Sequence, residues 1–183
     1  KTSSDIWTKL VDFDSLPQVL NPPGGYLHNE NDPYHFANLN TVLKPEDFPP
    51  SLPEPRLRLR SQHSLQLLHN DRQFSLEEIV EMKHSMGMLL ADRVKADLVS
   101  AVGKSKPDKE VQKALKLIED WDNTVAADSK GGVLFESWFQ RYLTAVRPAQ
   151  VDDPREAWDA AFHRPWSFDE PVSTPYGLSD PAK

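Results

Sequence analysis

The sequence has no cysteine among its 183 residues, and this absence excludes thiol catalysis, cysteine-based zinc sites and a disulfide framework. No stretch approaches the roughly 20 consecutive apolar residues that cross a bilayer, so no membrane span is predicted. Basic residues number 21 against 28 acidic ones, which gives a net charge of −7. A nucleic-acid partner is therefore disfavoured, because a phosphate-binding face needs an excess of positive charge.

Glycine is scarce, with seven residues, whereas proline is abundant, with sixteen, and the prolines are unevenly distributed. Only one proline falls between residues 61 and 147, and proline lacks the backbone donor that a helix interior needs. We therefore predict a mostly extended segment over 1–60, a helical region over 61–147, and an acidic tail with one short helix over 148–183 that runs over a surface. The predicted fold class is mainly α, with one or two short strands in the first 60 residues.

The central region has apolar residues at steps of three and four, which is the period of amphipathic helices. A capping box formed by Ser75 and Glu78, together with a stop at Gly103, predicts a long helix over 76–102. We further predict a helical turn over 62–69 and helices over 107–121, 133–146 and 154–162.

Three arginines alternate with leucine in the run from Arg56 through Arg58 to Arg60. In a strand, all three guanidinium groups would share one face and could bind a carboxylate or a phosphate. The competing interpretation is a solvated edge strand, which commonly carries such charges.

Glu81 and His84 have the Glu-x-x-His spacing that places two metal ligands on one side of a helix. Di-iron bundles need two copies of this motif and two further glutamates, whereas the sequence has one copy, so a surface pair is favoured. No glycine-rich phosphate loop and no Gly-x-Ser-x-Gly elbow occur. The residues therefore predict no self-contained catalytic constellation.

The polar cluster Asn29-Glu30-Asn31-Asp32 follows a short strand predicted over 26–29. Polar residues at the end of a strand are placed where binding sites are commonly built. An asparagine amide can donate to a developing oxyanion, although such a cluster is more often a turn that bonds its own backbone. The sequence leaves both interpretations open.

The stretch 21–32, which reads NPPGGYLHNEND, resembles the Asn-Pro, Gly-Tyr-Ile and Asn-x-Asn-Asn pattern of the penicillin acylase family. Further motifs resemble that family in the same order along the chain: Arg60-Ser61-Gln62, FSLEE at 74–78, LIEDWD at 117–122, LFESW at 134–138 and TPYGL at 174–178. The family comprises N-terminal nucleophile hydrolases, among them acyl-homoserine lactone and aculeacin-type acylases. The resemblance spans about 16–178.

This resemblance implies a helical part of an αββα hydrolase that cleaves an acyl amide of the penicillin, acyl-homoserine lactone or lipopeptide type. The family's nucleophile is the first residue of the large chain, and its terminal amine acts as the base. The resemblance implies that Asn31 is the oxyanion donor and that Arg60 orients it. Glu30, Asp32 and His63 depart from the family pattern, and a shift in register would put Arg58 in the place of Arg60.

On this resemblance we expect the chain to be an internal fragment of a large subunit, inactive alone. Its partners would be the small chain and the rest of the large chain, and its substrate a small acylated amide. The resemblance also implies a periplasmic or secreted location, and calcium in the complete enzyme but no cofactor in this chain. The alternatives are an independent helical interaction module, which would use the face of Trp138, Phe139 and Tyr142, and a metal-binding bundle built on Glu81 and His84.

Overall fold

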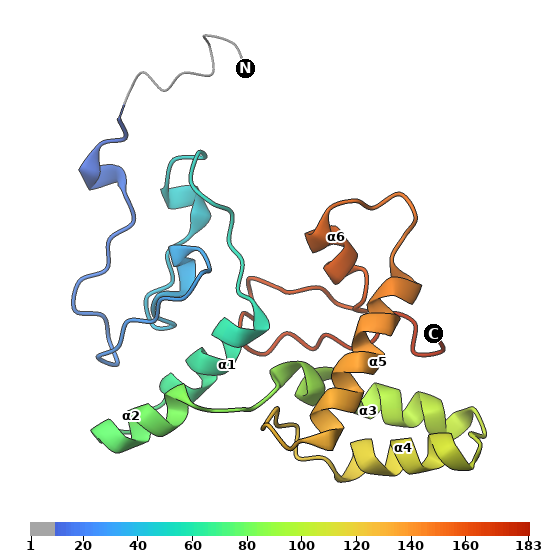
Figure 1. Cartoon of the computed structure of the whole chain (residues 1–183). Coiled ribbons are helices and arrows are strands. Elements are labelled where there is room, and N and C mark those ends of the chain that lie inside the picture. The colour runs from blue at the N-terminus through green and yellow to red at the C-terminus, as the bar shows by residue number, and fades with distance from the viewer. Residues whose placement is uncertain (1–9) are drawn as a thin grey trace.

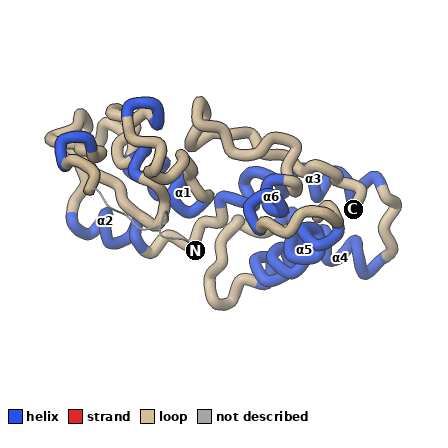
Figure 2. Tube along the Cα trace, turned by 90° about the horizontal axis from the view of Figure 1, so that it is seen from above, coloured by secondary structure: helices blue, strands red, loops and turns tan. Residues whose placement is uncertain are grey.

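The computed structural model describes residues 10–183, and this part of the chain is mainly helical (Figure 1). Its α-helices are α1 (Leu59–Leu68), α2 (Leu76–Lys83), α3 (Leu89–Lys104), α4 (Lys109–Asp120), α5 (Lys130–Val146) and α6 (Pro154–Asp159). Short 3-10 turns are η2 (Phe13–Ser15), η3 (Tyr34–Phe36) and η4 (Pro45–Asp47). Long loops fill the ends of the chain, and no strand occurs within 10–183 (Figure 2). The mainly α class is thus confirmed.

The helix predicted over 76–102 is two helices, α2 and α3, separated by a bend. Its start is confirmed, because Ser75 and Glu78 form the predicted capping box. The bend arises from contacts with a distant loop: the Met88 amide donates to Asn123, and the Met86 carbonyl accepts from Val125. These bonds divert the backbone, and the apolar period alone did not reveal them.

Helix α5 begins three residues before the predicted start, because Ser129 caps it by accepting a hydrogen bond from the Gly132 amide at 3.1 Å. Its first turn contains Gly131, where a Cβ atom would lie 2.3 Å from Cγ of Trp121. Glycine is therefore required for the helix to approach the Trp121 ring. Helix α6 ends at Asp159, earlier than predicted.

The main hydrophobic core surrounds α5, which contacts α4 and runs at a steep angle to it in the view of Figure 1. The completely or almost completely buried side chains of this core come from α3, from α4 and the residue that follows it, from α5 and from the tail: Ala91, Val94, Leu98, Ile118, Trp121, Phe135, Phe139, Tyr142, Ala161, Phe162, Tyr176 and Leu178. The last four belong to the tail expected to run over a surface. That expectation is wrong for 161–178, because its apolar side chains complete the core.

The C-terminal part of the chain also covers the aromatic face of α5. Phe139 and Tyr142 are each 2% exposed, and the Phe139 ring packs on Trp158 and Phe162. The interaction module considered above would need this face uncovered. The structure therefore gives that alternative no surface of the expected kind.

A smaller core joins the proline-rich segment to α1. It consists of Phe36 and Leu57 of that segment and Leu65 of α1, with flanking apolar residues. Trp166 of the tail packs against both cores, and its ring meets Phe36 edge-on at 5.8 Å. The predicted strand over 26–29 is instead an extended segment, which exchanges one backbone hydrogen bond, from His28 to Ala37. Within the described chain, no helix is both long and apolar enough to span a bilayer.

Candidate functional site

The loop that carries Asn31 lies against the first turn of α1, which carries Arg60. The Nη2 atom of Arg60 donates to Oδ1 of Asn31 at 2.7 Å, and its Nε donates to the Glu30 carboxylate at 2.7 Å. The structure thus brings together the two residues singled out in the sequence. Arg60 is held in this orientation because one guanidinium bonds two consecutive residues of the loop.

Glu30 is the centre of the contact between loop and helix. Its carboxylate accepts hydrogen bonds from Ser61 at 3.0 Å and Ser64 at 2.6 Å, and lies 3.4 Å from Nε2 of His28. Burial alone raises the pKa of Glu30, but the bonds from Ser64, Arg60, Ser61 and His28 outweigh it and lower the pKa from 4.5 to about 2. Glu30 is therefore a charged structural anchor and a weak base.

Because the folded-state pKa of Glu30 is depressed, its stabilising contribution is full above its unfolded value and is lost as pH falls toward the folded value. We expect the free energy of unfolding of wild type to exceed that of Glu30→Gln by an amount that shrinks between pH 4.5 and about 2. Urea unfolding in steps of pH measures this difference. Glu119→Gln, on the exposed side of α4, is the control for the loss of a surface carboxylate. A Glu30→Gln difference that stays constant to pH 2 contradicts the assignment.

A second ion pair ties the same loop to the residue just before α1. The Asp32 carboxylate, whose side chain is only 5% exposed, accepts from Nε of Arg58 at 2.5 Å and from its backbone amide at 2.9 Å. The arginine run is therefore not a strand with three free guanidinium groups. Arg58 and Arg60 hold the loop, while Arg56 lies near α6, where its positive charge partly opposes the burial that raises the pKa of Asp159.

These contacts leave one side of Asn31 available. Its Oδ1 is taken by Arg60, and its Nδ2 makes no hydrogen bond to any residue in the described range 10–183. The side chain is exposed. The side-chain amide of Asn31 is therefore a neutral N–H donor of fixed orientation, and its N–H groups point away from Arg60.

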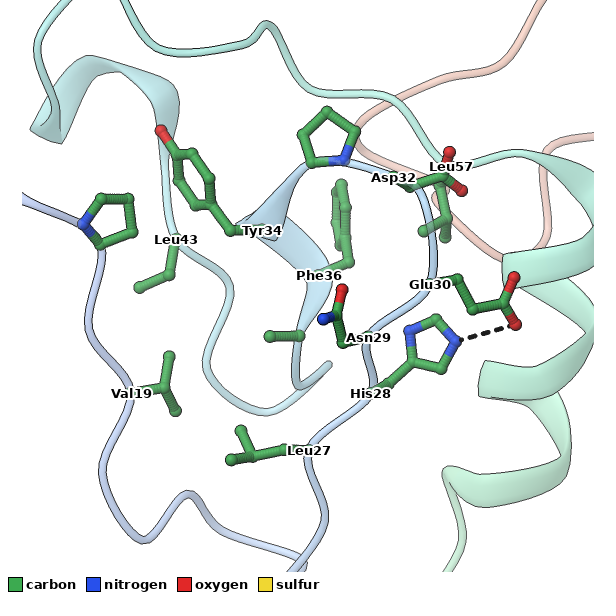
Figure 3. A pocket seen from close by; sticks show the side chains of 13 residues that line it. Val19, Leu27, His28, Asn29, Glu30, Asp32, Tyr34, Phe36, Leu43 and Leu57 are labelled. Atoms are coloured by element: carbon green, nitrogen blue, oxygen red, sulfur yellow. Dashed lines mark hydrogen bonds and ion pairs between the residues drawn. The ribbon is translucent and has the colours of Figure 1, made fainter.

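Beside this loop is a half-open pocket of about 320 Å³ (Figure 3). Its walls are mostly apolar and include Val19, Leu27, Tyr34, Phe36, Leu43 and Leu57. All four residues of the segment 27–30 line the pocket, and the side chains of His28 and Glu30 also reach toward α1, where both contact Ser64 (Figure 3). Asn31 itself does not line the pocket, although its neighbours Glu30 and Asp32 do.

Other candidates from the sequence are not brought together. Glu81 is exposed, and His84 caps the end of α2 through a bond from its ring to the Val80 carbonyl at 2.8 Å. Within 10–183 no group of three histidine or acidic side chains could hold a metal ion. The structure therefore gives the metal-binding bundle no support.

Sequence reasoning missed the role of His28, Ser61 and Ser64 in fixing Glu30. The signal was faint: Ser61 and Ser64 lie three residues apart, on one face of a helix that starts near Arg60. A long-range partner such as Glu30 could not be assigned to that face before the fold was known.

The sequence model of the penicillin amidase family matches residues 1–182, which is essentially the whole chain. This match agrees with the resemblance to the same family that the sequence motifs show. The chain belongs to the penicillin amidase family of amide-bond hydrolases.

Proposed function

We propose that this chain supplies an oxyanion-stabilising amide, Asn31, and its positioning residue, Arg60, to an acylase that cleaves an acyl amide. The N-terminal nucleophile of that enzyme lies outside the described residues. In the complete enzyme, the chain packs against the small chain and the remainder of the large chain, in the periplasm or outside the cell.

The observation that carries this proposal is the 2.7 Å hydrogen bond from Arg60 to Oδ1 of Asn31. An asparagine amide flips readily unless one end is fixed, and a permanently charged guanidinium can bond only the oxygen. Nδ2 must then point toward the open side of the loop. A neutral donor fixed in this way stabilises a developing oxyanion without any reorganisation during the reaction.

The hydroxyl groups near Asn31 do not provide a competing nucleophile. Ser64 lies 2.8 Å from Nε2 of His28, but its one proton is donated to Glu30 at 2.6 Å. Ser61 is buried and donates to the same carboxylate. With a pKa of about 2, Glu30 does not withdraw these protons near neutral pH, so neither serine is activated.

Calcium belongs to the proposal for the complete enzyme only. Within 10–183, no group of three histidine or acidic side chains could hold such an ion. The substrate is a small acylated amide of the penicillin, acyl-homoserine lactone or lipopeptide type.

The purified 183-residue chain, incubated with an acyl amide, is expected to release no amine above the background rate. The physical reason is that the oxyanion donor stabilises charge only after a nucleophile has attacked. Amine release is followed by a fluorogenic leaving group, with the complete acylase as positive control. Turnover by the chain alone that survives Asn31→Ala would overturn the proposal.

A further inference from the structure

We propose that Glu30 is a positioning residue for amide hydrolysis: its carboxylate fixes the guanidinium of Arg60 and, through it, the donating amide of Asn31. This inference rests on the proposed function of Asn31. It extends that function to a residue that departs from the family pattern, so the resemblance assigns Glu30 no role. Glu30 acts through Arg60 and is therefore not a catalytic residue.

The guanidinium of Arg60 needs a second fixed partner in order to hold Asn31. The Arg60 side chain is 61% exposed, so packing does not immobilise its long, flexible stem. One edge of the planar group makes two bonds, from Nε to Glu30 and from Nη2 to Asn31, both at 2.7 Å. Within 10–183, Glu30 is the one acidic residue that pairs with Arg60. The carboxylate therefore sets the plane of the guanidinium, and that plane sets where Oδ1 of Asn31 is held.

The Glu30 carboxylate is itself held on both oxygens. Its Oε2 accepts from Arg60 at 2.7 Å and from Ser61 at 3.0 Å. Its Oε1 accepts from Ser64 at 2.6 Å and lies 3.4 Å from Nε2 of His28. A carboxylate has about four lone-pair sites, and here each oxygen has two partners, so the group cannot turn without losing hydrogen bonds. Because Ser61 and Ser64 lie on α1 together with Arg60, these bonds fix the loop and the arginine relative to each other.

The direction of the hydrogen bonds requires an acceptor at both oxygens. Ser64 has one hydroxyl proton and donates it to Glu30, so Nε2 of His28, 2.8 Å from the same hydroxyl oxygen, acts as a donor. Every partner of the carboxylate is then a donor. The lowering of the Glu30 pKa to about 2 has the same cause, because all four bonds favour the ionised form. Glutamine at this position would turn an NH₂ group toward one of the two pairs of donors.

The test is a double-mutant cycle in the complete acylase with one acyl amide. Rates are normalised by titration of the N-terminal nucleophile, so that unfolded enzyme is not counted. Glu30→Ala is expected to lower kcat about tenfold and to leave KM nearly unchanged, because a misplaced donor weakens oxyanion stabilisation more than ground-state binding. In the Arg60→Met background, Glu30→Ala should cause no further loss, since the carboxylate acts through the arginine. A loss that multiplies with that of Arg60→Met overturns the proposal.

Glu30→Gln keeps the size of the side chain and serves as a second variant if Glu30→Ala does not fold. Its amide oxygen can still accept from Arg60, so the loss in kcat should be smaller, about threefold. Glu110→Gln is the matched control, because it removes a carboxylate that pairs with Lys113 at the same 2.7 Å on the exposed face of α4. This control should retain the wild-type kcat. Wild-type kcat in both Glu30 variants overturns the proposal.

The failure of this inference can be told apart from the failure of the proposed function. If Asn31→Ala lowers kcat while neither Glu30 variant does, the oxyanion role stands and the positioning role of Glu30 is rejected. If Asn31→Ala leaves kcat intact, the oxyanion role is rejected, and the positioning role is rejected with it even where Glu30→Ala lowers kcat.

Discussion

Replacing Asn31 by alanine in the complete acylase is expected to lower kcat by a factor of about 10²–10³, or ~3 kcal/mol of barrier. The amide bonds the carbonyl oxygen most strongly once it carries negative charge, so the loss falls on kcat and changes KM little. Steady-state kinetics on a single acyl amide measure both constants. A raised KM with an unchanged kcat would contradict an oxyanion role and would indicate ground-state binding instead.

Asn40→Ala is the control for this variant, because Asn40 is an exposed asparagine whose side-chain amide donates to the Pro23 carbonyl at 3.2 Å. It should retain the wild-type kcat. Arg60→Met should reproduce part of the Asn31→Ala loss, since the amide is then free to turn. Arg60→Lys should lie between Arg60→Met and wild type, because a lysine keeps the charge but not the fork that bonds Asn31 and Glu30 together.

Truncating Phe139 to alanine is expected to lower the free energy of unfolding by about 3–5 kcal/mol. The ring is 2% exposed and contacts Phe135, Trp158 and Phe162, so it joins α5 to α6 and the tail. Alanine leaves a cavity that these rings cannot close without leaving their own contacts. A loss of this size is a large fraction of the typical 5–15 kcal/mol stability of a domain.

Urea unfolding followed by circular dichroism measures this loss, in the isolated chain or within the complete acylase. Val133→Ala on the same helix is the matched control, since Val133 is 73% exposed and should change stability by less than about 0.5 kcal/mol. Phe139→Leu retains most of the volume and should fold even where Phe139→Ala does not. Equal stability for Phe139→Leu, Phe139→Ala and wild type would contradict a central role for this ring.

The part of the site that the sequence could predict is the pair Asn31 and Arg60, and it was predicted from a resemblance. The resemblance did not predict the two carboxylates that bond the arginines. Glu30 and Asp32 were taken as departures from the family pattern, whereas in the structure they bond Arg60 and Arg58. A carboxylate in a turn has the same local appearance whether it bonds its own backbone or a helix 30 residues away.

Helix periods were predictable because they depend on neighbours three and four positions apart. The break between α2 and α3 was not, since it is set by hydrogen bonds to 123–125. The burial of Tyr176 and Leu178 was missed for a related reason: prolines at 165, 171 and 175 exclude a helix but do not exclude burial. The sequence of a segment therefore indicates which secondary structure is excluded, but not whether other segments bury it.

The tail also fixes the order in which the site can be assembled during synthesis. Helix α1 is bonded by the tail through Gln62 to Tyr176 and through Gln66 to Val172, partners that lie 114 and 106 positions later in the sequence. At ribosomal speeds of about 5–20 residues per second, those partners appear roughly 6–20 s after the helix that carries Arg60. Until then the loop and α1 must hold Asn31 by their own two ion pairs. During synthesis, the ion pairs of Glu30 and Asp32 with Arg60 and Arg58 can thus form before the hydrogen bonds between the tail and α1.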